Sequence, residues 1–124
     1  MPVYPADLAA TLVARRVADR ARHRARAERL LVRVRLLGRS LRAEGAIEGS
    51  WLIGSLAWGG FGARSDVDLV VRGAALEAMG AVASRAAEQL GPEAEGRIDV
   101  LRLEDLASSF RDRVLTSGLR LDEP

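Results

Sequence analysis

The fold of this chain is decided by Gly54-Ser55-Leu56-Ala57-Trp58-Gly59-Gly60-Phe61-Gly62-Ala63-Arg64-Ser65-Asp66-Val67-Asp68-Leu69-Val70-Val71. The stretch starts with a turn that can approach a phosphate, continues through a glycine-rich loop, and ends in an apolar strand that opens with two carboxylates. Because successive strand side chains point to opposite faces, Asp66 and Asp68 project from the same face. Two such charges about 4 Å apart repel by ~4 kcal/mol at an effective dielectric of ~20. The pair therefore indicates a bound cation or full solvation, and the neighbouring glycine turn favours the cation.

The sequence around this stretch predicts an α+β fold in the order helix, strand, strand, helix, strand, helix. β-branched and apolar runs predict the strands, and apolar residues at helical spacing predict the helices. We expect strands over residues 46–53, 66–72 and 97–103, and helices over 6–44, 74–90 and 104–115. Gly118 is expected to begin a short tail.

The N-terminal segment is rich in Ala, Leu and Arg, which are strong helix formers, and Gly45 suits a C-terminal cap. One helix over 6–44 would be roughly 60 Å long at ~1.5 Å per residue. Its first half must therefore project, bend back as a second helix, or pack on another chain, and any break is expected in 18–27. We divide the single domain into a basic helical segment, 1–45, of one or two helices, and a core, 46–124.

Charge is distributed unevenly along the chain. Residues 15–42 carry 11 Arg against two acids, a net charge of +9, whereas residues 43–124 carry 8 Arg against 14 acids, a net charge of −6. This pattern indicates that the N-terminal helix contacts a partner, a second copy of the chain, or nucleic acid.

Two absences narrow the class of protein. The chain has no cysteine, so a disulfide framework and a thiolate metal site are excluded. No apolar run approaches the ~20 residues of a membrane span, and residues 1–5 lack the features of a signal peptide. We therefore expect a cytoplasmic protein without a membrane partner.

Further residues extend the expected site around the two carboxylates. Gly54 has no Cβ, so its backbone can approach a phosphate, and Ser55 supplies a hydroxyl at an expected helix N-terminus. Asp66 and Asp68 offer the hard oxygen ligands that suit Mg²⁺. Asp99 lies on another strand and would complete a three-carboxylate cluster if that strand is a neighbour. The alternative for Asp99 is an ion pair with a flanking arginine, Arg97 or Arg102.

Gly54-Ser55, ten intervening residues and Asp66-Val67-Asp68 resemble the signature of the nucleotidyltransferases related to DNA polymerase β. The resemblance extends from Trp51 to about Leu119 and includes the strand carboxylate in Ile98-Asp99-Val100. It implies a small mixed β-sheet, a palm-like core, with flanking helices. It further implies transfer of AMP from ATP to a hydroxyl acceptor, a two-metal Mg²⁺ site on Asp66, Asp68 and Asp99, and Asp99 as general base. Nucleotide-binding residues would be Gly54, Ser55, Arg64 and Ser65, although Ser65 also suits a turn hydroxyl.

The short length resembles the minimal nucleotidyltransferases, which are commonly encoded beside a small helical HEPN protein. That pairing implies an antitoxin that binds the toxin and adenylylates one of its tyrosines. Two positions depart from the pattern, because Leu56 and Trp58 stand where many relatives carry arginine. A non-catalytic module that acts by occlusion is therefore an alternative. The sequence also leaves nucleic acid or a small molecule open as the acceptor, and the N-terminal helix is a candidate for homo-oligomer formation.

Overall fold

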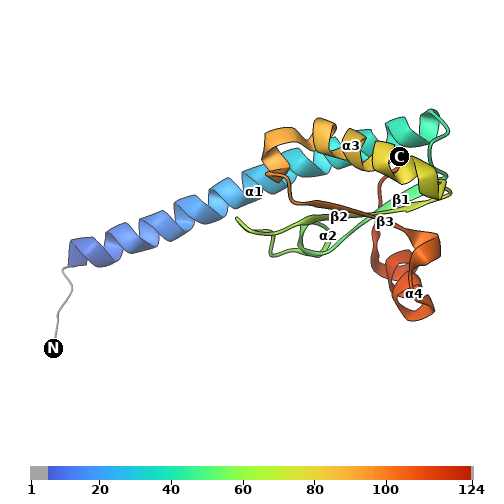
Figure 1. The fold of residues 1–124 in the computed structure, drawn as a ribbon. Coiled ribbons are helices and arrows are strands. Elements are labelled where there is room, and N and C mark those ends of the chain that lie inside the picture. Colours follow the sequence, from blue (N-terminus) through green and yellow to red (C-terminus); the bar gives the residue numbers. More distant parts are fainter. Residues whose placement is uncertain (1–5, 124) are drawn as a thin grey trace.

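A computed structural model describes residues 6–123 of the 124-residue chain. Helices and strands alternate along the chain, and the strands form one sheet (Figure 1). In chain order they are α1 (Ala6–Ala43), β1 (Gly49–Ile53), α2 (Ser55–Trp58), β2 (Val67–Arg72), α3 (Met79–Leu90), β3 (Ile98–Arg102), α4 (Ser108–Ser117) and β4 (Leu119–Arg120). Short 3₁₀ turns lie at Leu76–Ala78, Gly91–Ala94 and Leu103–Asp105. The expectation about a signal peptide concerns residues 1–5, which lie outside the described range.

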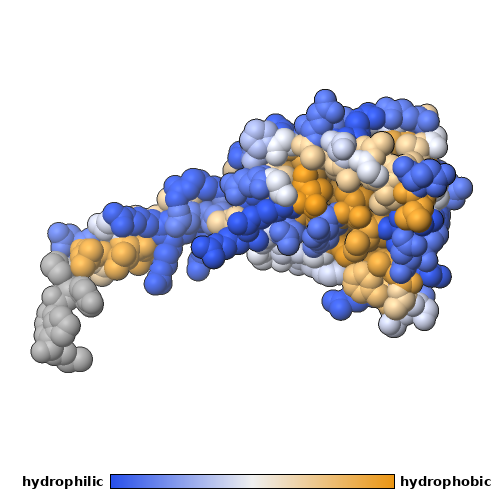
Figure 2. Space-filling model, viewed as in Figure 1, coloured by the Kyte–Doolittle hydropathy of each residue, from blue (hydrophilic) through white to orange (hydrophobic). Residues whose placement is uncertain are grey.

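Helix α1 is a single unbroken helix of 38 residues, so the possible break in 18–27 does not occur. Its first half projects from the body, and its buried residues begin only at Leu30 (Figure 1). Gly45 ends it as expected, with a φ of +75° and with the N–H of Ala46 donating to the carbonyl of Leu41. Figure 2 shows hydrophilic side chains along the middle of the helix and an apolar group near its start. That group consists of the exposed residues Leu8, Leu12, Val13 and Val17.

The sheet is mixed and four-stranded, in the order β3-β2-β1-β4. β1 pairs antiparallel with both β2 and β4, whereas β2 and β3 are parallel. The α+β class with a small mixed sheet and a long N-terminal helix is thus confirmed.

Each face of the sheet has its own apolar cluster. Helices α1 and α3 cover one face (Figure 1). There the alternate β2 residues Val67, Leu69 and Val71 pack with α1 and α3. On the other face α4 packs through Val114 against Trp51, Ile53, Val70 and Leu103. Because β2 alternates, Asp66 and Asp68 lie on the α4 face.

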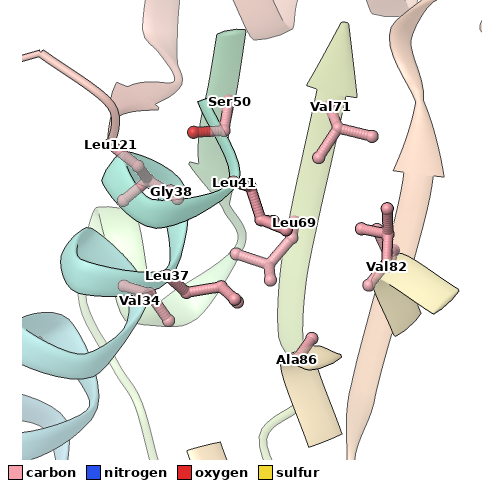
Figure 3. Close-up of a pocket in the computed structure, with 11 residues that line it drawn as sticks. Val34, Leu37, Gly38, Leu41, Ser50, Leu69, Val71, Val82, Ala86 and Leu121 are labelled. Atoms are coloured by element: carbon pink, nitrogen blue, oxygen red, sulfur yellow. The ribbon is translucent and has the colours of Figure 1, made fainter. Parts of the chain in front are cut away.

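Between α1, the sheet and α3 the core encloses a void of about 10 Å³. Figure 3 shows it lined by apolar side chains and by the Ser50 hydroxyl, with Gly38 of α1 next to Leu121. A Cβ added at Gly38 would lie 2.7 Å from the Ser50 Oγ and 3.0 Å from the Leu121 Cβ. The absence of a side chain at Gly38 therefore sets how closely α1 approaches β1 and the C-terminal segment.

The C-terminal segment is not a tail, and the expectation for Gly118 was wrong. Leu119–Arg120 form β4 beside β1, and Leu121 and Asp122 are buried. The Asp122 carboxylate accepts hydrogen bonds from the Ser50 N–H (2.7 Å) and from Arg42 and Arg120 (both 2.7 Å). These bonds tie the end of the chain to α1 and to β1.

The last two helices begin later than expected. α3 starts at Met79 after the 3₁₀ turn at Leu76–Ala78. α4 starts at Ser108, because the chain first makes a 3₁₀ turn at Leu103–Asp105 and then runs extended through Leu106 and Ala107. The burial of Leu103 against Val70 holds that turn on the sheet and displaces the helix start.

Gly38→Ala is expected to lower the free energy of unfolding, because overpacking costs about 1–3 kcal/mol and outweighs the ~1 kcal/mol that alanine gains in a helix. Gly80→Ala is the matched control, because Gly80 also lies in a helix and an added Cβ there meets nothing within 4 Å. The control is expected to raise stability by up to about 1 kcal/mol. Urea unfolding of both variants measures the difference, and equal shifts would contradict the close packing at Gly38.

Among residues 6–123 no helix combines the length and the apolar character that crossing a membrane requires.

Candidate functional site

Three carboxylates converge at the end of the sheet where β2 and β3 begin. Asp68 of β2 and Asp99 of β3 are direct partners in the parallel ladder, so their side chains leave the sheet side by side on one face. Asp66 precedes β2 by one residue and projects from the same face. One carboxylate oxygen of each residue lies within 4.8 Å of the others. The expected convergence of Asp66, Asp68 and Asp99 is therefore present in the structure.

The cluster is open to solvent and rich in unbalanced negative charge. Asp66 and Asp99 are exposed, and Asp68 between them is half-buried. Partial burial raises the pKa of Asp68, and the charges of Asp99 and Asp66 raise it further. The repulsion favours binding of a cation, and carboxylate oxygens are hard ligands of the kind that hold Mg²⁺ in proteins.

Within residues 6–123 none of the three carboxylates forms an ion pair. Arg102 instead reaches Glu104 (3.8 Å) and Asp105 (3.3 Å). The alternative that Asp99 pairs with a flanking arginine is therefore wrong. In the described range, neither Arg97 nor Arg102 forms an ion pair with Asp99.

Gly54 has a structural requirement that the sequence did not reveal. Its φ of +79° and ψ of −163° fall in a region that essentially only glycine adopts. A Cβ at this position would lie 2.6 Å from the Asp68 Oδ2. The missing side chain at Gly54 therefore leaves room for the Asp68 carboxylate, whereas the sequence predicted room for a phosphate.

Ser55 is the first residue of α2, as expected for a hydroxyl at a helix start. Two of the next residues of this helix make contacts within the protein. Leu56 is buried in the core, and the Trp58 indole N–H donates to the Ser117 carbonyl (2.8 Å). The Arg113 guanidinium lies 5.1 Å from the Trp58 ring, so the tryptophan packs on α4.

The loop between α2 and β2 is held by its own turn and by α1. The Ser65 Oγ accepts a hydrogen bond from the Gly62 N–H (2.9 Å), which makes Ser65 a turn hydroxyl. Arg64 is exposed and, among the described residues, forms no ion pair. Arg26 of α1 lies over the Phe61 ring at 5.0 Å and donates to the Glu93 carbonyl at 2.6 Å.

Arg26 is a residue that sequence reasoning missed. Nothing in local spacing distinguishes it from the other arginines of α1, because its partners lie 35 or more positions further along the chain. Its contacts place the middle of α1 beside the glycine-rich loop.

The comparisons with known proteins assign no family to this chain. No protein-family model matches the sequence, and no curated protein matches it. The fold and the site define an α+β protein with a three-carboxylate cluster whose oxygens could hold a metal ion.

Proposed function

We propose that this chain is a Mg²⁺-dependent nucleotidyltransferase of the DNA polymerase β type with a palm-like core. It moves AMP from ATP to a hydroxyl acceptor. The observation that carries the proposal is the convergence of Asp66, Asp68 and Asp99 within 4.8 Å, directly beside Gly54-Ser55. This arrangement supports a ligand whose phosphates meet both a cation site and a helix start.

The reaction follows from the roles of these side chains. Asp66, Asp68 and Asp99 would hold Mg²⁺, which supplies neutralisation of phosphate charge when bound. The exposed Asp99 carboxylate accepts the proton of the acceptor hydroxyl. The acceptor oxygen then bonds to the α-phosphorus, while the bond from that phosphorus to the bridging oxygen breaks and pyrophosphate leaves. Gly54 leaves room for the Asp68 carboxylate, because a Cβ at this position would lie 2.6 Å from the Asp68 Oδ2.

The acceptor comes from outside the chain. Two of the three carboxylates, Asp66 and Asp99, are exposed. A protein surface can therefore reach the cluster, and we propose a tyrosine of a small helical HEPN-type partner, with an antitoxin role for this chain.

Incubation of the chain with labelled ATP, Mg²⁺ and the product of the adjacent gene tests the proposal. We expect the partner to gain label and one or more AMP masses by mass spectrometry. The Asp66→Asn/Asp68→Asn variant is the control. Labelling of equal extent with this variant would overturn the assignment of the site.

A second function is a non-catalytic module that neutralises a partner by occlusion. It is favoured by α2, in which Leu56 is buried and Trp58 is held by Ser117, so this helix offers no cation to a triphosphate. Calorimetric titration with ATP and Mg²⁺ separates the two functions, because occlusion requires no nucleotide binding.

A further inference from the structure

A second site lies between α1 and the glycine-rich loop, next to the acidic cluster. It is a groove of about 290 Å³, at the low end of the ~300–1,000 Å³ of small-molecule pockets. Arg20, His23 and Arg24 of α1 line one wall. Ser55, Gly59 and Gly60 line the other.

The groove has a strongly positive wall. Arg20 and Arg24 are four residues apart and therefore lie on one face of the helix, with both side chains exposed. Among residues 6–123 neither arginine is in an ion pair, unlike Arg22 and Arg29 of the same helix. No carboxylate of the described part of the chain, residues 6–123, lines the groove. The free charge is thus available to an anion.

The opposite wall leaves room for that anion. Gly59 and Gly60 have φ values of +104° and +84°, and a Cβ added at either residue would meet nothing within 4 Å. Arg26, one turn after His23, holds the loop against α1 through the Phe61 ring and the carbonyls of Gly62 (3.4 Å) and Glu93 (2.6 Å). Both walls are therefore fixed relative to each other.

Ser55 links the groove to the acidic cluster. It lines the groove and directly follows Gly54, whose α-carbon abuts the Asp68 carboxylate. In the chain, one peptide bond therefore joins a residue of the groove to the residue that faces the Asp68 carboxylate. A cation held at the acidic cluster and the arginines of the groove would both attract phosphates. The two sites together therefore suit a ligand that carries several phosphates in a row.

We propose that Arg20 and Arg24, with His23 between them, bind the distal phosphates of the nucleoside triphosphate, whose α-phosphate lies at the acidic cluster. The proposal rests on the proposed function and names the side chains that replace the cations absent from α2. It gives the basic middle of α1 a role as a positioning element for the nucleotide.

The test compares two double variants that remove the same charge. Arg20→Gln/Arg24→Gln alters the groove, whereas Arg15→Gln/Arg39→Gln alters exposed positions of α1 outside it. Glutamine keeps the helix propensity of arginine, so both variants are expected to fold. The probes are ATP with Mg²⁺, inorganic tripolyphosphate, and AMP, each titrated by calorimetry.

We expect the groove variant to bind ATP and tripolyphosphate at least about tenfold more weakly, because charge-assisted hydrogen bonds are lost. AMP affinity should change by less than about twofold in this variant, and all affinities by less than about twofold in the control, because distant exposed charges are screened. Equal affinities of the two variants for tripolyphosphate would overturn the proposal. So would a loss of affinity seen for a short oligonucleotide and not for tripolyphosphate, which would make the groove a nucleic-acid surface.

AMP transfer to the partner is measured separately and distinguishes the two proposals. Transfer and ATP binding that are both unchanged in the groove variant would overturn the groove and leave the nucleotidyltransferase intact. Triphosphate binding that depends on Arg20 and Arg24 without any transfer would support the groove and overturn the catalytic function.

Discussion

The Asp66→Asn/Asp68→Asn variant is expected to transfer AMP at least about a thousandfold more slowly than the wild type. The reason is that a bound cation contributes several kcal/mol of transition-state stabilisation. The same variant should be at least as stable as the wild type without metal. Each amide removes a charge from a cluster in which partial burial and like charges already raise the pKa of Asp68. One such repulsion at about 4 Å is worth between ~1 kcal/mol in water and ~4 kcal/mol near a protein surface.

The combination of lost activity and retained stability is what identifies a metal site. Thermal unfolding with and without Mg²⁺ provides the readout, since a ligand that binds only the folded protein raises its melting temperature. We expect Mg²⁺ to stabilise the wild type and to leave the variant unchanged. A variant that melts well below the metal-free wild type would show that the carboxylates serve the fold instead.

Asp122→Ala is expected to destabilise the chain by about 3–5 kcal/mol, as for the loss of one partner from a buried ion pair. The Asp122 side chain is fully buried, and Arg42 and Arg120 both pair with it at 2.7 Å. Removal would leave the buried Ser50 N–H without its acceptor and Arg42 without its carboxylate, and Arg120 would keep only the pair with Glu123. Since domains are stable by only ~5–15 kcal/mol, this is a large share of the total.

Glu123→Ala is the matched control for Asp122→Ala. Glu123 is the next residue and also faces Arg120, but at 3.6 Å and with its side chain 54% exposed. Exposed pairs are worth about 0–1 kcal/mol, so the control should unfold close to the wild type in urea. Similar losses in the two variants would contradict a buried anchor at Asp122.

The effect of Asp122 depends on pH in a defined direction. Burial alone would raise the pKa of this carboxyl, but the hydrogen bonds from Arg120 and from the Ser50 N–H hold it well below its usual range. Its contribution is therefore complete above the unfolded pKa of about 4 and is lost as the pH falls toward the folded value. The difference in unfolding free energy between wild type and Asp122→Ala should accordingly shrink below about pH 4.

The sequence predicted those parts of the structure that depend on local patterns. The alternation around Asp66 and Asp68 placed both carboxylates on one face, and the apolar run around Asp99 predicted its strand. That these strands are neighbours was an assumption, which the pairing of Asp68 with Asp99 confirms.

The parts that the sequence did not predict depend on distant contacts. β4 has two residues, too few for any periodic signal, and exists because β1 and the Asp122 hydrogen bonds hold it. The groove needs Arg20 and Ser55, which are 35 positions apart, to lie together. The continuity of α1 through its alanine-rich part follows from helix propensity, although no apolar stripe marks it there.

The strand alternation of β2 also constrains how the gene can change. Val67, Leu69 and Val71 face the core, while Asp66 and Asp68 face the opposite side. Insertion or deletion of one codon within β2 would exchange these two sets, turning carboxylates under α1 and α3 and apolar side chains toward the acidic cluster. The hydrophobic core and the acidic cluster therefore depend on a single register of β2, and a change in chain length is tolerated better in the loop that precedes Asp66 than within the strand.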